Sequence, residues 1–157
     1  MPKVIAEGNL IMYNFDKVSP EGCYNSDSVK LCKYYIMPLY EMNLKQYMSH
    51  FKSPKERYCR IFEITKQLLG ILKYVHAARR TFNDMKLENI MINTNGDFQR
   101  TPQVFLIDFG FSKKFYKDKN SVEHIEENTL VDSFQGNILF SSHSQMSFHE
   151  TSRRDDL

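Results

Sequence analysis

Four polar side chains between residues 84 and 108 have types and a spacing that could do chemistry together. Asp84, Lys86 and Asn89 occur in "TFNDMKLENIMIN", and Asp108 follows in "DFG" after an apolar run. Transfer of the γ-phosphoryl group of ATP to a hydroxyl needs a proton acceptor, a cation for the phosphate charge and oxygen ligands for Mg²⁺. We assign the first role to Asp84, the second to Lys86 and the third to Asn89 and Asp108.

Each of these residues also has an ordinary structural explanation. A loop cap, a solvated lysine, a turn residue and a strand end would account for the four in turn. However, a pattern such as D-x-K-x-x-N arises by chance only about once in 10⁴ starting positions, and a nearby D-F-G makes coincidence rarer still. The chemical interpretation is therefore favoured.

Short strands are predicted to position these side chains. The stretches Val4 to Phe15 and Leu31 to Leu39 are rich in β-branched and aromatic residues, and a polar, turn-forming stretch separates them, which predicts two strands and a loop. Further on, "IMIN" and "VFLIDF" flank an Asn95-Gly96 dipeptide. This pattern predicts a β-hairpin, which would return Asp108 to the neighbourhood of Asn89.

A long helix is predicted to follow "SPKE". Ser53 suits the N-cap, Pro54 the first helical position and Glu56 the other half of a capping box. Apolar residues then recur at helical spacing, which predicts a face packed on the core, made of Tyr58, Ile61, Phe62, Thr65, Leu68, Leu69, Leu72, Val75 and His76. A membrane-surface helix is the weaker alternative because the polar face mixes charges.

The remaining third of the chain shows little periodicity. Residues 111 to 151 are polar, with lysines at 113, 114, 117 and 119, so we expect a long loop. In the final "TSRRDDL", Ser152 and Asp155 have the spacing of a helix N-terminus. We expect a helix to begin there.

Composition indicates a folded protein without an obvious polyanionic partner. The 157 residues are 41% hydrophobic, and 21 basic residues nearly balance 19 acidic ones, so nucleic-acid binding is not indicated. No apolar run approaches the ~18 residues of a membrane span, and no signal peptide is evident. The three cysteines Cys23, Cys32 and Cys59 fit no metal or redox spacing. We therefore expect free thiols, no membrane partner and a cytoplasmic or nuclear location.

The motifs and their order resemble the catalytic domain of eukaryotic protein kinases, and specifically the casein kinase 1 family. The family's H-R-D-I-K-P-x-N aligns without gaps with "FNDMKLEN" from Phe82 to Asn89, and its D-F-G with Asp108, Phe109 and Gly110. Its G-T-x-x-Y-A-S aligns with "GNILFSS", and its S-R-R-D-D-L is identical to residues 152 to 157. The resemblance covers essentially the whole chain.

The resemblance implies an α+β, partial protein-kinase-like fold. Residues 1 to 39 would form the last small-lobe strands and the hinge, and residues 40 to 157 the first half of the mainly helical large lobe. It also implies a serine/threonine protein kinase that uses ATP and Mg²⁺ and is a monomer when complete. The family tends towards acidic or pre-phosphorylated protein substrates. The lysine cluster could serve these, although a solvated surface is the simpler interpretation.

Other site residues follow only from the resemblance. In "YYIMPLYEMNL", Met37 would guard the back of the adenine pocket, and Pro38, Leu39 and Tyr40 would border the adenine. Asp156 would hydrogen-bond the backbone of the catalytic loop, residues 82 to 89. Phe109 and Gly110 would shape the magnesium-binding turn.

Four residues depart from the family pattern, and none of them is a transfer group. Phe82 and Asn83 replace His and Arg, Leu87 replaces Pro, and Asn137 replaces a Thr that commonly supports the catalytic Asp and Lys. The family's glycine-rich loop, its strand lysine, its helix glutamate and its later helices are not found in the chain. We therefore expect a kinase fragment or a truncated gene product.

Two other hypotheses stay open at this point. The replaced His and Arg are compatible with a catalytically inactive, pseudokinase-like binding module. A zinc enzyme that uses His124, His143 or His149 is a third possibility, but these histidines match no known zinc spacing.

The absence of an arginine at position 83 generates a prediction about regulation. Because a bidentate phosphate partner is missing, phosphorylation of the segment after the D-F-G motif should not activate the full-length protein. Glutamate at Ser121, Thr129 or Ser133 should leave the rate of peptide phosphorylation unchanged, as should alanine at the same positions. A higher rate in any glutamate variant would contradict the prediction.

Overall fold

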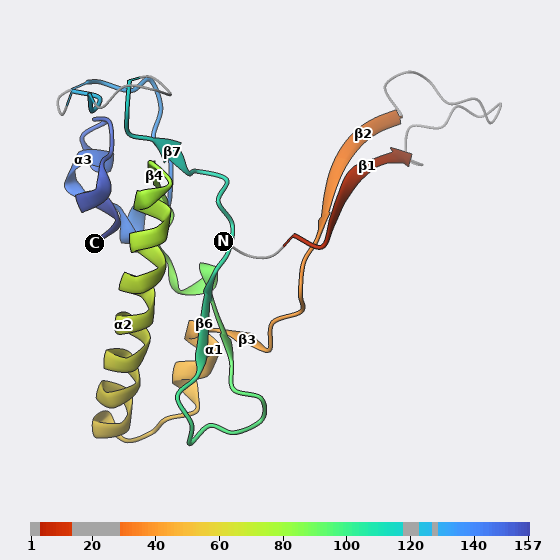
Figure 1. The fold of residues 1–157 in the computed structure, drawn as a ribbon, viewed down its shortest axis with the longest axis vertical. Helices are drawn as coiled ribbons and strands as arrows, with labels where there is room; N and C mark the ends of the chain where they lie inside the picture. The colour runs from red at the N-terminus through yellow and green to blue at the C-terminus, as the bar shows by residue number, and fades with distance from the viewer. Residues whose placement is uncertain (1–3, 14–28, 118–122, 127–128) are drawn as a thin grey trace. The chain divides into compact units, whose positions relative to one another are not determined.

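The computed structural model describes residues 4–117, with a gap at 14–28, together with 123–126 and 129–157, and the chain divides into two compact units, Pro2–Leu39 and Tyr40–Leu157 (Figure 1). The smaller unit is an antiparallel pair, β1 (Ala6–Tyr13) and β2 (Val29–Ile36). This confirms the two predicted strands. Phe15, the predicted end of the first strand, lies outside the described residues. The second ends at Ile36 rather than Leu39, two residues before Pro38, which has no N–H to donate.

The larger unit contains a three-stranded antiparallel sheet in the order β3 (Met42–Asn43), β5 (Ile90–Asn93) and β6 (Gln103–Leu106). Strands β5 and β6 form the predicted hairpin, with Ile90 opposite Leu106. In its turn, Asn95 and Gly96 have φ of 52° and 77°. These left-handed conformations suit Asn and Gly better than other residues.

The Glu41 carboxylate holds this turn. It accepts hydrogen bonds from the Thr94 N–H at 2.9 Å, the Thr94 hydroxyl at 2.7 Å and the Asn95 N–H at 2.7 Å. These bonds, chiefly those from Thr94, lower the pKa of Glu41. Since Glu41 directly precedes β3, its side chain ties the start of the sheet to the far end of the hairpin.

Two helices follow β3. The first, α1 (Leu44–Ser49), begins with a reciprocal capping box in which Asn43 and Gln46 each accept the other's backbone N–H at 2.9 Å. The second, α2 (Pro54–Ala77), has Ser53 at its N-cap as predicted, but Ser53 makes no side-chain capping bond. The predicted capping box is therefore wrong at this helix. In a capping box the N-cap side chain accepts the N–H of the third helical residue, and no such bond from Glu56 to Ser53 forms here.

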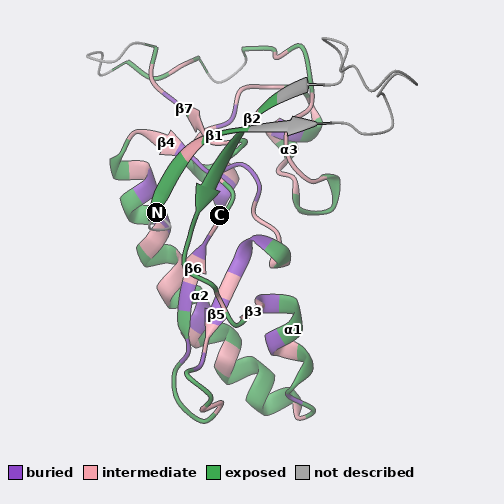
Figure 2. Cartoon of the chain, turned by 90° about the vertical axis from the view of Figure 1, so that its right-hand side faces the viewer, coloured by how far each residue is buried: buried purple, intermediate pink, exposed green. Residues whose placement is uncertain are grey.

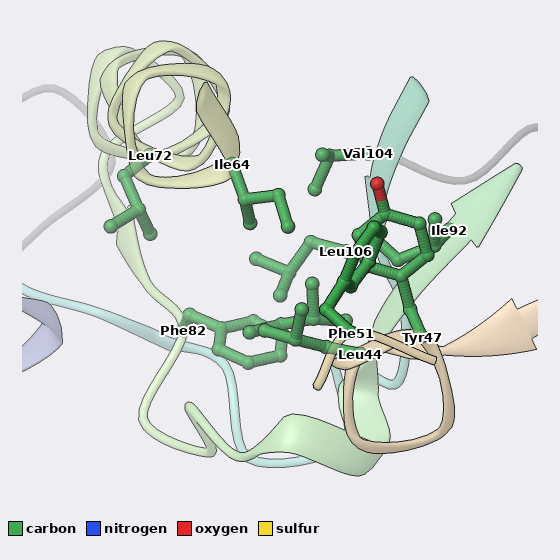
Figure 3. Close-up of a cluster of buried hydrophobic side chains, with 10 residues drawn as sticks. Leu44, Tyr47, Phe51, Ile64, Leu72, Phe82, Ile92, Val104 and Leu106 are labelled. Atoms are coloured by element: carbon green, nitrogen blue, oxygen red, sulfur yellow. The ribbon is translucent and has the colours of Figure 1, made fainter. Parts of the chain in front are cut away.

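The core lies between α2 and the hairpin. Ile64 and Leu72 project from α2 towards the hairpin strands and Phe82 (Figure 3). They pack with buried residues of α1, of the segment directly after α1 and of the hairpin strands: Leu44, Tyr47, Phe51, Ile90, Ile92, Val104 and Leu106. Burial is concentrated on β5 and β6, whereas α2 also carries exposed and intermediate residues (Figure 2).

The predicted core face of α2 is only partly right. Leu72 and Val75 are buried, but Tyr58, Phe62 and Leu69 are 75%, 69% and 51% exposed. The packed side of α2 contains polar residues, so the spacing of apolar residues alone did not identify it. On that side Arg60 donates to the Phe98 and Gln99 carbonyls at 3.1 Å, and Gln67 donates to the Pro102 carbonyl at 2.8 Å.

Short elements interrupt the predicted loop of residues 111 to 151, although most of its described residues lie in no helix or strand. β7 (Lys113–Lys114) pairs with β4 (Arg80–Thr81), which lies before the loop, as does η3 (Leu87–Asn89). Within the loop follow η4 (Ile138–Phe140) and α3 (His143–Met146), and after it η5 (Arg153–Asp156). The helix predicted at Ser152 is thus a single 3₁₀ turn, closed by the Ser152 N–H bonded to Asp155 at 2.7 Å.

Two of the three cysteines lie in the described part of the chain. Cys32 and Cys59 are free thiols, as predicted, while Cys23 lies outside the described residues. In the parts of the chain that the structure describes, no helix has both the length and the apolar character needed to cross a bilayer.

The contacts of Glu41 predict a specific acid sensitivity. A folded-state pKa below the ordinary value gives stability that is complete above the unfolded-state pKa and is lost as pH falls through the folded-state pKa. Glu41→Gln should therefore lower the urea midpoint at neutral pH, with the difference shrinking as the solution becomes acidic. Glu88→Gln is the matched control, because the Glu88 side chain, in the part of the chain that the structure describes, makes only a surface pair with Lys45 at 3.8 Å. Equal pH dependence in the two variants would contradict this.

Candidate active site

The loop between β4 and β5 brings three of the predicted residues into contact. Oδ2 of Asp84 accepts hydrogen bonds from Nζ of Lys86 and from Nδ2 of Asn89, both at 2.7 Å. Nδ2 of Asn89 also donates to the Asp84 carbonyl at 2.9 Å. Asp84 and Asn89 are buried, at 1% and 4% exposed, and Oδ1 of Asp84 has no hydrogen-bond partner among the described residues. One carboxylate oxygen is thus fixed by two donors while the other is uncommitted.

Asp108 lies beside this group. The Ile107 N–H donates to the Asn89 carbonyl at 2.9 Å, which continues the hairpin ladder beyond Ile90 and Leu106 and brings Asn89 opposite Ile107. Asp108, the next residue, is exposed and has φ of 60°. Its Oδ1 accepts the Gly110 N–H at 3.2 Å. A left-handed aspartate is uncommon, and such strained residues concentrate at functional sites.

Phe82, which occupies the position of the family's histidine, is a core residue. Its side chain is fully buried, and its ring meets that of Phe109 edge-on, with centroids 5.0 Å apart and planes at 77°. Phe109 belongs to the D-F-G turn, so this contact joins that turn to the loop that carries Asp84. Leu87, another departure, packs partly buried against the same core.

Asp156 organises the start of the loop. Its carboxylate accepts the Phe82 N–H at 2.9 Å, the Asn83 N–H at 2.8 Å and Nε2 of His76 at 2.8 Å. The predicted bonds to the loop backbone are therefore confirmed, and the partner on α2 is an addition. Asp156 is 4% exposed, so these bonds compensate for burying a carboxylate.

Asn83 is enclosed by residues that the sequence analysis did not single out for this role. It has φ of 67°, and its Nδ2 donates to the Phe111 carbonyl at 3.0 Å. Its own carbonyl accepts Nε2 of Gln145 at 2.9 Å, and a Cβ at Gly136 would lie 2.7 Å from it. A signal for Gln145 was available, because Ser142 and Gln145 have the spacing of a capping box, and the structure forms that box.

The predicted adenine-binding residues are divided between the two units. Met37, Pro38 and Leu39 end the smaller unit, where all three are exposed. Tyr40 begins the larger unit, where its ring lies 4.9 Å from that of Phe105. The adenine contacts of these four residues stay a prediction.

Asn137 and the lysine cluster make contacts of their own. Oδ1 of Asn137 accepts the Leu139 N–H at 3.0 Å and so caps η4. Lys113 pairs with Glu150 at 3.4 Å, and Lys117 pairs with Glu123 and Glu126, each at 3.5 Å. Lys119 lies outside the described residues. Acidic side chains of the protein itself thus offset part of the cluster's charge.

Comparisons with known proteins agree with these motifs. Residues 22–145 match the protein kinase domain. A probable casein kinase I homolog of Encephalitozoon cuniculi is 30% identical over 128 residues, which cover 78% of this chain and 35% of that protein. A casein kinase 1-like protein of Oryza sativa subsp. japonica is 30% identical over 94 residues, covering 60% of this chain and 13% of that protein. The chain therefore spans about a third or less of the length of these two relatives.

The bonds of Asp156 predict its contribution to stability. In Asp156→Asn, the new amide group would face at least one of the backbone N–H donors, so the free energy of unfolding should fall by about 3 kcal/mol. The control is Asp155→Asn in the same 3₁₀ turn. The Asp155 side chain accepts one backbone N–H there, so the free energy of unfolding should fall by about 1 kcal/mol. Urea unfolding measures both, and equal losses would contradict the central role of Asp156.

Proposed function

The chain belongs to the protein kinase domain family and is casein kinase 1-like, and from this premise we propose that the protein transfers the γ-phosphoryl group of ATP to serine or threonine hydroxyls of other proteins. The geometry of Asp84 is the observation that best supports this activity. Its Oδ2 is held by Lys86 and Asn89, while its buried Oδ1 has no partner among the described residues. A carboxylate oriented in this way is suited to accept the proton of an attacking hydroxyl.

Asp84 would act as the general base. A base must come within ~2.6–3.2 Å of the group whose proton it takes. Fixing Oδ2 limits rotation of the carboxylate and keeps Oδ1 in one orientation. The proton of the substrate hydroxyl would pass to Oδ1 as the oxygen attacks the phosphorus.

Lys86 would supply positive charge at the same place. Its side chain is 24% exposed while its ammonium group contacts Asp84. On the γ-phosphate it would offset negative charge on the transferring group. Its short distance to Asp84 would keep the base and the phosphate close together.

Asn89 and Asp108 fit a hard divalent cation. Protein kinases as a family use ATP and a divalent metal, and Mg²⁺ prefers oxygen ligands. The amide nitrogen of Asn89 is bonded to Asp84, which leaves its Oδ1 as the ligand atom, and Asp108 is an exposed carboxylate beside it. When bound, Mg²⁺ would neutralise the phosphate oxygens. Residues of this chain would hold it through one amide and one carboxylate oxygen.

The remaining assignments extend this proposal. Met37, Pro38, Leu39 and Tyr40 would border the adenine, and the substrates would be proteins of the cytoplasm or nucleus. Acidic or pre-phosphorylated substrates are less favoured than the lysine count suggests, because Lys113 and Lys117 already pair with glutamates. A catalytically inactive binding module is also less favoured, since all four transfer groups are retained.

Asp84→Asn tests this function in the full-length protein with Mg-ATP and a mixture of peptide substrates. Removal of the base should lower kcat for phosphate transfer by roughly 10²- to 10⁴-fold. The control is Asp97→Asn, which changes a side chain that, among the described residues, accepts the Gln99 N–H and pairs with Arg100 in the hairpin loop. Equal transfer by wild type and Asp84→Asn would exclude Asp84 as the base.

A further inference from the structure

One buried side chain outside the transfer groups contacts the catalytic loop. Gln145, on α3, is 6% exposed. Its Nε2 donates to the Asn83 carbonyl at 2.9 Å and to the Gln135 carbonyl at 3.0 Å, and its Oε1 accepts the Ser142 N–H at 3.0 Å. Both amide hydrogens and the amide oxygen are therefore used. One side chain thus joins the segment from Gln135 to Ser142 to the catalytic loop, where Asn83 lies 62 residues before Gln145 in sequence.

The carbonyl that Gln145 binds belongs to the peptide group that leads into Asp84. Because a peptide group is planar, fixing the Asn83 oxygen also fixes the direction of the Asp84 nitrogen. The preceding peptide is fixed from the other side by Asp156, which accepts the Asn83 N–H at 2.8 Å. Asn83 itself has φ of 67°, a conformation that persists only when neighbouring groups enforce it.

We propose that Gln145 is a positioning residue for the phosphoryl-transfer reaction, which holds the peptide before Asp84 in its productive orientation. The inference rests on the proposed function. It assigns no direct contact with ATP or the substrate to Gln145. The chain thereby links the segment around Gln135 and Ser142 to the base through neutral hydrogen bonds.

These neutral hydrogen bonds to the catalytic loop differ from contacts that a phosphorylated residue would make. Position 83 carries an amide that donates to the Phe111 carbonyl, and the nearby Lys113 pairs with Glu150 at 3.4 Å. A buried amide needs no modification to make its bonds. The loop is therefore held in the unmodified protein, which is consistent with the predicted insensitivity to phosphorylation.

The test is Gln145→Glu in the full-length protein, with Gln67→Glu as the matched control. The substitution at 145 turns an oxygen towards two carbonyls and keeps the bond to Ser142. Gln67 also bridges distant backbone, from Nε2 to the Pro102 carbonyl at 2.8 Å and from the Val104 N–H to Oε1 at 3.2 Å, but it contacts no residue of the catalytic loop in these bonds. Both variants should lose similar stability.

Two measurements separate positioning from stability. Gln145→Glu should lower kcat roughly 10- to 100-fold with little change in the KM for ATP, and hydrogen exchange should accelerate at the amides of residues 82–86. Gln67→Glu should change neither. If Gln145→Glu fails to fold, Gln145→Met, which is of similar length but lacks the amide, replaces it.

The outcomes distinguish this inference from the proposed function. Unchanged exchange at residues 82–86, or faster exchange with unchanged kcat, overturns the role of Gln145. A full-length wild-type protein with no phosphate transfer removes the proposed function. In that case faster exchange at residues 82–86 in Gln145→Glu alone would still support its hold on the loop, and unchanged exchange would overturn it.

Discussion

The carboxylate of Asp156 is the constraint on which the candidate site depends. It joins α2, through His76, to the backbone of Phe82 and Asn83, and these two residues lead directly into Asp84. Without a buried acceptor, two backbone N–H groups would be left without partners at the base of the loop. The side chains of Lys86 and Asn89 can order the Asp84 carboxylate only because its backbone is already held.

The core and the site share residues, so stability and geometry are linked. Phe82 is part of the cluster that packs α2 against the hairpin, and it also contacts Phe109 of the D-F-G turn. The hairpin itself brings Asn89 next to the residue before Asp108. Changes in the hydrophobic core will therefore be transmitted to the candidate metal ligands through a few side chains.

Local patterns in the sequence predicted the features that are determined by residues close together in the sequence. The Asn95-Gly96 turn, the helix start at Pro54 and the close grouping of Asp84, Lys86 and Asn89 are set by short spacings. The packed side of α2 was not predictable in this way, because Arg60 and Gln67, which are partly buried, bond to carbonyls 35 to 40 residues away. The bond from Gln145 to Asn83 spans 62 residues. Asp156 was identified only through family resemblance, since no local pattern connects it to residue 82.

The exchange of an imidazole for a benzene ring at Phe82 alters how the loop responds to acid. A histidine has an ordinary pKa near 6.5, so its charge and hydrogen bonds change within the physiological range. Phenylalanine has no ionisable group, and its edge-on contact with Phe109 depends on apolar burial and ring geometry. The coupling between the base-bearing loop and the D-F-G turn is thus independent of protonation at this position, at mildly acidic as well as at neutral pH.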